Sequence, residues 1–272
     1  MPLNPTPRPA PTALALCAHK GGVGKTTTAM ALSAALARAG DRVLLVDLDP
    51  QGHSTMGLGL DVDDDDVRAR TVRELLADDP RPLESVEHQT GVPNLTLVPA
   101  TIPLERTAQW LVTAPARDRR LQRGLAAAAG RYAWVVIDCP PSLGALTENA
   151  LIAADAVLVP CRMEARATDG VKGLLEVLNE LRPQWATDQN WRILRNARDV
   201  RRRVSNEFAE AMFTKYAGHV LETVIPQCDE LNKAQFAGVD IFTYDASCSG
   251  AVAYTRLAAD VRELWAQVNA RR

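Results

Sequence analysis

Residues 17–32 read CAHKGGVGKTTTAMAL and carry the glycines and the Gly-Lys-Thr ending that are typical of a phosphate-binding loop. The glycines allow a tight loop whose backbone N–H groups face a phosphate, and the following helix adds the partial positive charge of its amino end. Lys25 is expected to reach the β- and γ-phosphates of a nucleotide, Thr26 to bind Mg²⁺, and Thr27 to contact the α-phosphate. The predicted loop comprises Lys20, Gly21, Gly22, Val23, Gly24, Lys25, Thr26 and Thr27.

Lys20 is a second lysine in this loop, one residue before the first glycine, where phosphate binding alone requires none. A solvated lysine at the end of a strand is one explanation of its presence. A contact with a phosphate is the other, and the spacing of the two lysines does not distinguish them. The choice therefore depends on what the rest of the chain resembles.

Three aspartates end apolar runs that are typical of buried strands. Asp47 and Asp49 end the run RVLLVDLD at 42–49, and Asp138 ends WVVID at 134–138. Carboxylates at the ends of strands beside a phosphate loop are costly to bury unless a cation is near. Asp138 is expected to hold Mg²⁺ through a water, because Mg²⁺ keeps much of its hydration shell.

Short apolar runs alternate with helical stretches along the whole chain, and most of the runs are apolar throughout, as in strands covered on both faces of a parallel sheet. The expected strands are 12–19, 42–49, 94–100, 132–140, 155–161, 191–196 and 219–226. The expected helices are 25–39, 71–77, 117–129, 144–153, 169–181, 204–216 and 251–269. Thr71 and Glu74 fit a capping box that starts the second helix. The alternation predicts a doubly wound α/β fold with a mostly parallel sheet, helices on both faces, and ligands at the carboxyl ends of the strands.

The composition favours one cytoplasmic α/β domain. The chain has 272 residues, 47% of them hydrophobic, and a net charge of −2. We expect a single domain over 12–272 and a flexible proline-rich tail over 1–11. Five scattered cysteines without a CxxC pair argue against a disulfide framework or a zinc site and favour a reducing cytoplasm. No apolar run is long enough to span a membrane, so no membrane association is expected, and nucleic-acid binding would need a local basic patch.

The stretch KGGVGKTT resembles the deviant Walker A motif of the ParA/MinD family of ATPases, and the resemblance extends over roughly residues 12–266. In that family the extra lysine reaches across a dimer interface to the partner's nucleotide, which implies such a role for Lys20. The stretch LLVDLDPQGH resembles the family's DxDPQGN motif, with His53 in place of the usual asparagine. The resemblance implies that Asp49 positions or activates the attacking water and that Asp47 supports the metal shell.

The same resemblance suggests where a nucleotide base lies and which loop precedes the interface. The stretch VIPQCDELNKAQFAG resembles the segment that lines the family's adenine pocket, which implies contacts from Pro226 and Gln227. Asn196 is a candidate for reading the adenine edge, and local polar capping explains it equally well. The stretch LVPCRMEARATDGV resembles the strand and loop before the family's long interface helix, and Glu164 and Gly170 match that pattern.

Residues 192–203 contain six arginines on a chain whose net charge is −2. Arginines that neutralise DNA phosphates give an affinity that depends on salt and not on base sequence. A solvated helix face is the alternative, but DVRRRVS resembles a family segment near the surface used on nonspecific DNA. One departure from the family weakens its basic surface. The stretch SCSGAVAY at 247–254 resembles a family pattern in which a lysine is common at the position of Ser249. The predicted DNA contacts are Arg195, Arg198, Arg201, Arg202 and Arg203.

Together these features predict a ParA-type ATPase that uses ATP and Mg²⁺ and forms an ATP-dependent homodimer with Lys20, Lys25 and Asp49 as catalytic residues. The resemblance also implies binding to nonspecific DNA of the nucleoid and a ParB-like or adaptor protein that stimulates hydrolysis. A membrane-cycling relative of MinD is the alternative, and it would need a basic amphipathic helix at the end of the chain. A nitrogenase iron protein would need paired cluster cysteines, which the sequence lacks. The aspartate run at 61–66 is expected to be a solvated loop, and a docking site for a basic segment of a partner is the alternative.

Overall fold

The computed structural model describes the backbone of residues 12–164, 167–183 and 190–269, with side chains up to residue 265. Over these residues, eight strands form one sheet in the order β3-β4-β2-β5-β1-β6-β7-β8. The strands are β1 (Thr12–Leu16), β2 (Val43–Asp47), β3 (His88–Gln89), β4 (Leu95–Val98), β5 (Trp134–Asp138), β6 (Ala156–Arg162), β7 (Trp191–Arg198) and β8 (Val220–Pro226). The tail expected over 1–11 lies outside the described residues.

Neighbouring strands of the sheet run parallel, except that β3 pairs with β4 in the antiparallel direction. Successive side chains of β1 point to opposite faces, so Ala13 and Ala15 join one hydrophobic cluster while Leu14 and Leu16 join another. Both faces of the central strands are therefore covered. This explains why these strands are apolar without alternation.

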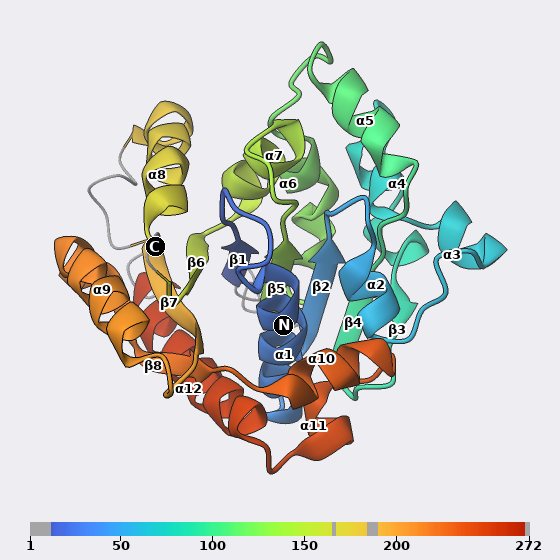
Figure 1. Ribbon diagram of the computed structural model, residues 1–272. Coiled ribbons are helices and arrows are strands. Elements are labelled where there is room, and N and C mark those ends of the chain that lie inside the picture. Colours follow the sequence, from blue (N-terminus) through green and yellow to red (C-terminus); the bar gives the residue numbers. More distant parts are fainter. Residues whose placement is uncertain (1–11, 165–166, 184–189, 270–272) are drawn as a thin grey trace, which may run out of the picture.

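Helices pack on both faces of this sheet (Figure 1). The helices of the described residues are α1 (Lys25–Arg38), α2 (His53–Gly57), α3 (Asp65–Ala69), α4 (Val72–Leu76), α5 (Leu104–Leu111), α6 (Arg120–Gly124), α7 (Ala145–Ala153), α8 (Asp169–Leu181), α9 (Arg203–Phe213), α10 (Asp229–Phe236), α11 (Ile241–Asp245) and α12 (Ser249–Asn269). Helices α4 to α9 pack into the cluster that contains Ala15, and α1, α10, α11 and α12 pack into the cluster that contains Leu16. The predicted doubly wound α/β fold is confirmed.

The carboxyl ends of the central strands bring together residues that are far apart in the sequence. In the register of the sheet, Asp138 at the end of β5 lies beside Leu16 of β1 on one side and Asp47 of β2 on the other. The loop that follows β1 therefore begins next to the predicted carboxylates. The fold places the expected ligand site at this edge, as in other doubly wound sheets.

The sequence suggested that the aspartate run at 61–66 is a solvated loop, but the end of the run is helical in the structure. Asp64 caps α3, because its side chain accepts hydrogen bonds from the backbone N–H groups of Asp66 and Val67. Asp66 in turn forms an ion pair with Arg70, one helical turn later. The end of the run thus starts a helix, because a carboxylate at the N-cap satisfies free backbone donors.

Arg120, at the start of α6, is almost fully buried and connects neighbouring segments of the chain by hydrogen bonds. Its guanidinium donates to the carbonyl of Leu76 at 3.1 Å, the carboxylate of Asp78 at 2.6 Å and the carbonyl of Pro115 at 3.0 Å. The same group lies 4.4 Å from the centre of the Trp110 ring. We expect Arg120→Ala to lower the free energy of unfolding by about 2–4 kcal/mol, measured by urea denaturation.

Arg123 is the matched control for this prediction, because it is exposed on the same helix and has no side-chain hydrogen bond or ion pair among the described residues. Arg123→Ala removes the same groups and is expected to change stability by no more than about 0.5 kcal/mol. Equal effects of the two substitutions would contradict the structural role of Arg120.

Candidate functional site

A glycine-rich loop over residues 17–24 connects β1 to α1. Gly22 (φ 71°) and Gly24 (φ 92°) adopt left-handed conformations, which favour glycine. A Cβ atom on Gly24 would lie 2.1 Å from Nδ2 of Asn196, whereas a Cβ atom on Gly21 or Gly22 would meet nothing within 4 Å. The loop is thus tightly packed at Gly24 and has free space at its other glycines, as a cradle for phosphates requires.

A cavity of about 570 Å³ opens in front of this loop and the amino end of α1. Lys25 lines the cavity and is largely buried, and its Nζ donates to the carbonyl of Lys20 at 3.3 Å. The cavity brings together most of the predicted nucleotide-binding residues, namely Gly21, Gly22, Gly24, Lys25, Thr26 and Thr27. Val23 instead turns its side chain into the core.

Asp138 lies fully buried at the inner edge of the loop, next to Thr26 and Lys25. Its Oδ2 accepts a 2.7 Å hydrogen bond from the Ser54 hydroxyl, while its Oδ1 is buried without a hydrogen-bond partner. Burial raises the pKa of this carboxyl, and the hydroxyls of Ser54 and Thr26 and the charge of Lys25 oppose the rise. A free oxygen on a buried carboxylate is costly unless a cation or donor satisfies it.

These residues fit a magnesium ion. Thr26 offers a hydroxyl and Asp138 an unused carboxylate oxygen, and oxygen atoms are the ligands that Mg²⁺ prefers. Among the described residues, no group of three His, Cys, Asp or Glu side chains could hold a metal by itself. An ion here would therefore depend on phosphate and water oxygens as well, which is the usual arrangement for Mg²⁺ with a nucleotide.

Asp47 is buried beside Asp138, but hydrogen bonds within the protein already engage both of its oxygens. Its Oδ1 accepts from the backbone N–H of Asp49 at 3.1 Å, and its Oδ2 accepts from the N–H and hydroxyl of Thr55 at 2.9 and 2.8 Å. Burial and the neighbouring charge of Asp138 raise the pKa of Asp47. These bonds hold the start of the loop after β2, and the support of the metal shell that the family resemblance implies for Asp47 stays a prediction.

Asp49 faces the cavity, as predicted. It lines the same space as Lys25 and Thr26, and its Oδ1 accepts a 3.0 Å hydrogen bond from the backbone N–H of Gln51. The side-chain amide of Gln51 donates to the carboxylate of Glu105 of α5 at 3.4 Å, and Glu105 also lines the cavity. A carboxylate held in this way is suited to orient a water molecule toward a phosphate.

Lys20 lies outside this cavity, although its carbonyl contacts Lys25. Its ammonium group forms an ion pair with Glu164, in the loop after β6. The Lys20 side chain is 44% exposed and that of Glu164 is 34% exposed. The two lysines of the loop therefore point to different places, one inward and one to the surface.

A neighbouring cavity of about 260 Å³ adjoins the loop on the other side of Gly24. Asn196, Pro226 and Gln227 all line it, as predicted for a base pocket. The amide of Asn196 is already engaged, because Nδ2 donates to the carbonyl of Val23 at 2.7 Å and Oδ1 accepts from the N–H of Ala197 at 2.8 Å. These bonds favour a role of Asn196 in fixing the loop over a role in reading a base.

The structure separates the predicted DNA-binding arginines into two kinds. Arg195 is partly buried and is bonded to Glu210 and to the carbonyls of Leu221 and Glu222. The others are exposed at the end of β7 and the start of α9, and of these Arg201 pairs with Asp199. The exposed surface therefore consists of Arg198, Arg201, Arg202 and Arg203, which we call the arginine patch.

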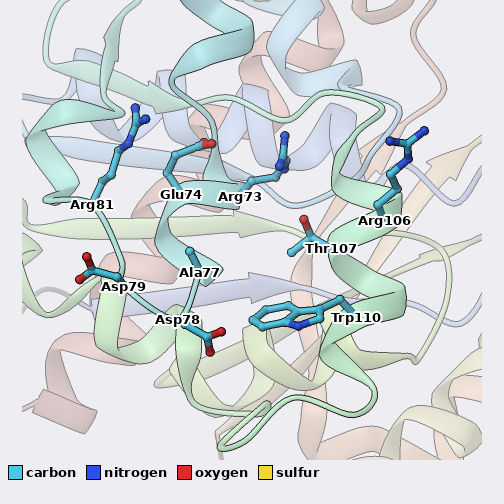
Figure 2. Close-up of a pocket in the computed structure, with 9 residues that line it drawn as sticks. All are labelled: Arg73, Glu74, Ala77, Asp78, Asp79, Arg81, Arg106, Thr107 and Trp110. Atoms are coloured by element: carbon cyan, nitrogen blue, oxygen red, sulfur yellow. The ribbon is translucent and has the colours of Figure 1, made fainter.

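A cavity of about 530 Å³ also lies between α4 and α5, away from the loop (Figure 2). Trp110 lines it from α5, together with Arg106 of the same helix and Arg73 of α4. It shares no lining residue with the cavity at the glycine loop. It therefore takes no part in the chemistry predicted from the sequence.

A parallel sheet with a glycine loop between its first strand and helix, and an aspartate at the end of the adjacent strand, defines the class of P-loop nucleoside triphosphatases. A family model described as an AAA domain matches residues 12–192. The chain is 39% identical over 249 residues to the sporulation initiation inhibitor protein Soj of Bacillus subtilis, covering 91% of this chain and 97% of the relative. It is 38% identical over 240 residues to the chromosome partitioning protein ParA of Myxococcus xanthus, covering 88% and 83%.

A solved structure with the same fold is that of cobyrinic acid a,c-diamide synthase from Mycobacterium smegmatis with bound ADP and magnesium. It is 35% identical to this chain, with a TM-score of 0.78, and the match covers 94% of this chain and 95% of the other. This chain belongs to the Soj/ParA family of ATPases.

Two residues of the site carried no role in the sequence interpretation. Ser54 holds Asp138 by its hydroxyl, and its only signal is its place just after the DPQGH motif. Glu105 also lines the cavity and belongs to α5, a helix that the sequence did not predict. No sequence signal could have found Glu105, because only the packing of α5 brings it to the loop.

Proposed function

We propose that this ATPase forms a nucleotide-gated homodimer that binds nonspecific DNA and so segregates or positions a cargo. The observation that carries the proposal is the opposite orientation of the two lysines in one phosphate loop. Lys25 faces the chain's own cavity, whereas Lys20 is directed to the surface at Glu164. A cation in that position is available to a phosphate held by another subunit.

The residues of the cavity supply electrostatic stabilisation for phosphoryl transfer from ATP to water. Lys25 and the N–H groups of the glycine loop bind the phosphates and stabilise the charge that develops on them. Thr26 and Asp138 would hold Mg²⁺, which would supply further positive charge at the phosphate oxygens. Asp49 orients the attacking water, because its carboxylate lines the cavity beside the phosphate loop and is held there by the N–H of Gln51.

The arginine patch supports the DNA-binding part of the proposal. Its members lie close together in sequence and space and are exposed, and Arg202 and Arg203 have no ion pair among the described residues. Each exposed guanidinium can displace a counterion from a DNA phosphate, which gives affinity without base specificity. The patch lies near the carboxyl end of β7, on the side of the base cavity.

Changing Arg201, Arg202 and Arg203 together to Glu should abolish DNA binding while leaving ATP binding intact, because the three residues line neither cavity at the loop. Binding to a duplex of arbitrary sequence at low salt, by fluorescence anisotropy, measures the loss. Changing Arg106, Arg119 and Arg123 to Glu is the matched control, since it makes the same charge change on exposed residues of another face. Equal loss in both triple variants, or none in the first, would contradict the assignment.

The partner in this proposal is a ParB-like or adaptor protein that stimulates hydrolysis, and the site of action is the cytoplasmic nucleoid. Among the described residues, no helix is both long enough and apolar enough to cross a bilayer. A membrane-cycling function would instead need a free amphipathic helix at the end of the chain, and it is less well supported. The apolar stripe of α12 is also occupied, because Leu257 and Val261 are fully buried against the sheet.

A further inference from the structure

We infer that Glu164 restrains Lys20 in the single subunit, so that dimer closure must exchange the Lys20–Glu164 ion pair for the contact between Lys20 and the partner's nucleotide. This inference rests on the proposed dimer and adds its regulation. Glu164 would then be a positioning residue that sets how readily ATP drives dimerisation. It is not a catalytic residue, because it lines neither the phosphate cavity nor the base cavity.

Backbone hydrogen bonds connect the described residues on either side of the Glu164 carboxylate to neighbouring segments. The N–H of Met163 donates to the carbonyl of Asn196 in the adjacent strand at 2.9 Å. The carbonyl of Glu164 accepts from the N–H of Ala167 at 3.0 Å, and its N–H donates to the carbonyl of Arg162 at 2.9 Å. The Glu164 carboxylate binds the Lys20 ammonium group in the single subunit, so Lys20 must leave it to reach a partner's nucleotide.

The phosphate loop also contacts α8 near His19 and β7 near Val23. A Cβ atom on Gly170 of α8 would lie 3.5 Å from the backbone nitrogen of His19, and one on Gly173 would lie 3.2 Å from its Nδ1. On the other side, Asn196 holds the carbonyl of Val23. The residues on both sides of Lys20 thus contact α8 and β7, while the Lys20 side chain is partly exposed and bound to Glu164.

Breaking the Lys20–Glu164 ion pair costs free energy when the dimer closes, and removing the charge of Glu164 eliminates that cost. Parting the ion pair leaves Glu164 as an unpaired carboxylate next to the closing interface. A partly exposed ion pair has a modest strength, and a symmetric dimer parts two of them. Glu164→Gln is therefore expected to tighten the dimer by about two- to thirty-fold, since both pairs no longer have to be broken.

The experiment measures the dimer dissociation constant of the full chain by analytical ultracentrifugation with Mg²⁺ and a nonhydrolysable ATP analogue. Glu164→Gln should lower this constant while the affinity of the single subunit for the analogue stays the same. The difference from wild type should shrink as salt increases, because salt screens an exposed pair. Glu84→Gln is the matched control, since Glu84 is an exposed carboxylate that pairs with Arg131 and lines neither cavity at the loop, so it is expected to change neither constant.

A second measurement tests the ion pair itself in the nucleotide-free subunit. Acylation of Lys20 by an N-hydroxysuccinimide ester, followed by peptide mass spectrometry with Lys172 as internal reference, should be faster in Glu164→Gln because the amine is no longer held. Glu164→Asp, which keeps the charge, should retain part of the protection. Faster acylation together with an unchanged or weaker dimer would overturn the inference but leave the proposed dimer standing. Failure of the wild type to dimerise with the ATP analogue would overturn the proposed dimer and this inference with it.

Discussion

Lys25→Ala should abolish ATP binding at concentrations that saturate the wild type. Lys25 is the buried cation of the phosphate cavity, with its Nζ directed at the inner side of the loop. Removing one partner of a buried charge pair costs roughly 2–5 kcal/mol, which corresponds to a loss of affinity of roughly 30- to 4000-fold. Isothermal titration calorimetry with Mg²⁺ and a nonhydrolysable ATP analogue measures the loss.

Lys172→Ala is the matched control for Lys25→Ala, because Lys172 is 78% exposed on α8 and lines neither cavity at the loop. It should bind the analogue like the wild type. Thermal unfolding without nucleotide should show that Lys25→Ala remains folded, since the substitution loses one long hydrogen bond to the carbonyl of Lys20. Normal nucleotide affinity in a folded Lys25→Ala variant would contradict the assignment of this glycine loop as the phosphate-binding loop.

The central part of this fold could be predicted because its signals are local. Each central strand is a short apolar run, and the glycine loop joins the first run to a helix that starts at Lys25. The capping box of Thr71 and Glu74 marks the start of α4 in the sequence and is present in the structure. In each case a few adjacent residues determine the backbone, so one sequence suffices.

The peripheral elements could not be predicted for the same reason. Helices α2, α3 and α11 have five residues each, too few for a periodic pattern, and isolated helices of that length are unstable in water. The strand β3 has two residues and exists because it pairs with β4 at the edge of the sheet. Tertiary packing and pairing determine these elements, and a single sequence does not show them.

The residues of the functional site show the same difference between local motifs and tertiary contacts. Lys25 and Asp138 belong to motifs, and the structure places both where the motifs imply. The environment of Arg195 was not visible in the sequence, because its charge is satisfied by Glu210, a residue from the following helix. The pairing of Lys20 with Glu164 likewise depends on β6 lying next to β1 in the sheet. Motifs therefore identified which side chains can do chemistry, and strand order determined which of them meet.

Lys20→Gln is expected to leave ATP binding largely intact and to remove hydrolysis. Its side chain lies outside the chain's own phosphate cavity, so the loss of its charge should not affect the affinity of a single subunit. Asp49→Ala should likewise bind ATP without turnover, because it removes the carboxylate proposed to orient water. Steady-state phosphate release and nucleotide titration measure the two properties separately for each variant.

A mixture of these two inactive variants decides whether Lys20 acts on its own nucleotide or on the partner's. In a mixed dimer, the nucleotide of the Lys20→Gln subunit has Asp49 from its own chain and Lys20 from the partner, so that site is complete. An equal mixture should therefore recover about a quarter of the wild-type rate, since half of the dimers are mixed and each has one complete site of two. If Lys20 acts within its own subunit, no site in the mixture is complete and the mixture stays inactive. Full activity of Lys20→Gln alone would instead show that the second lysine is only a solvated residue at the end of a strand.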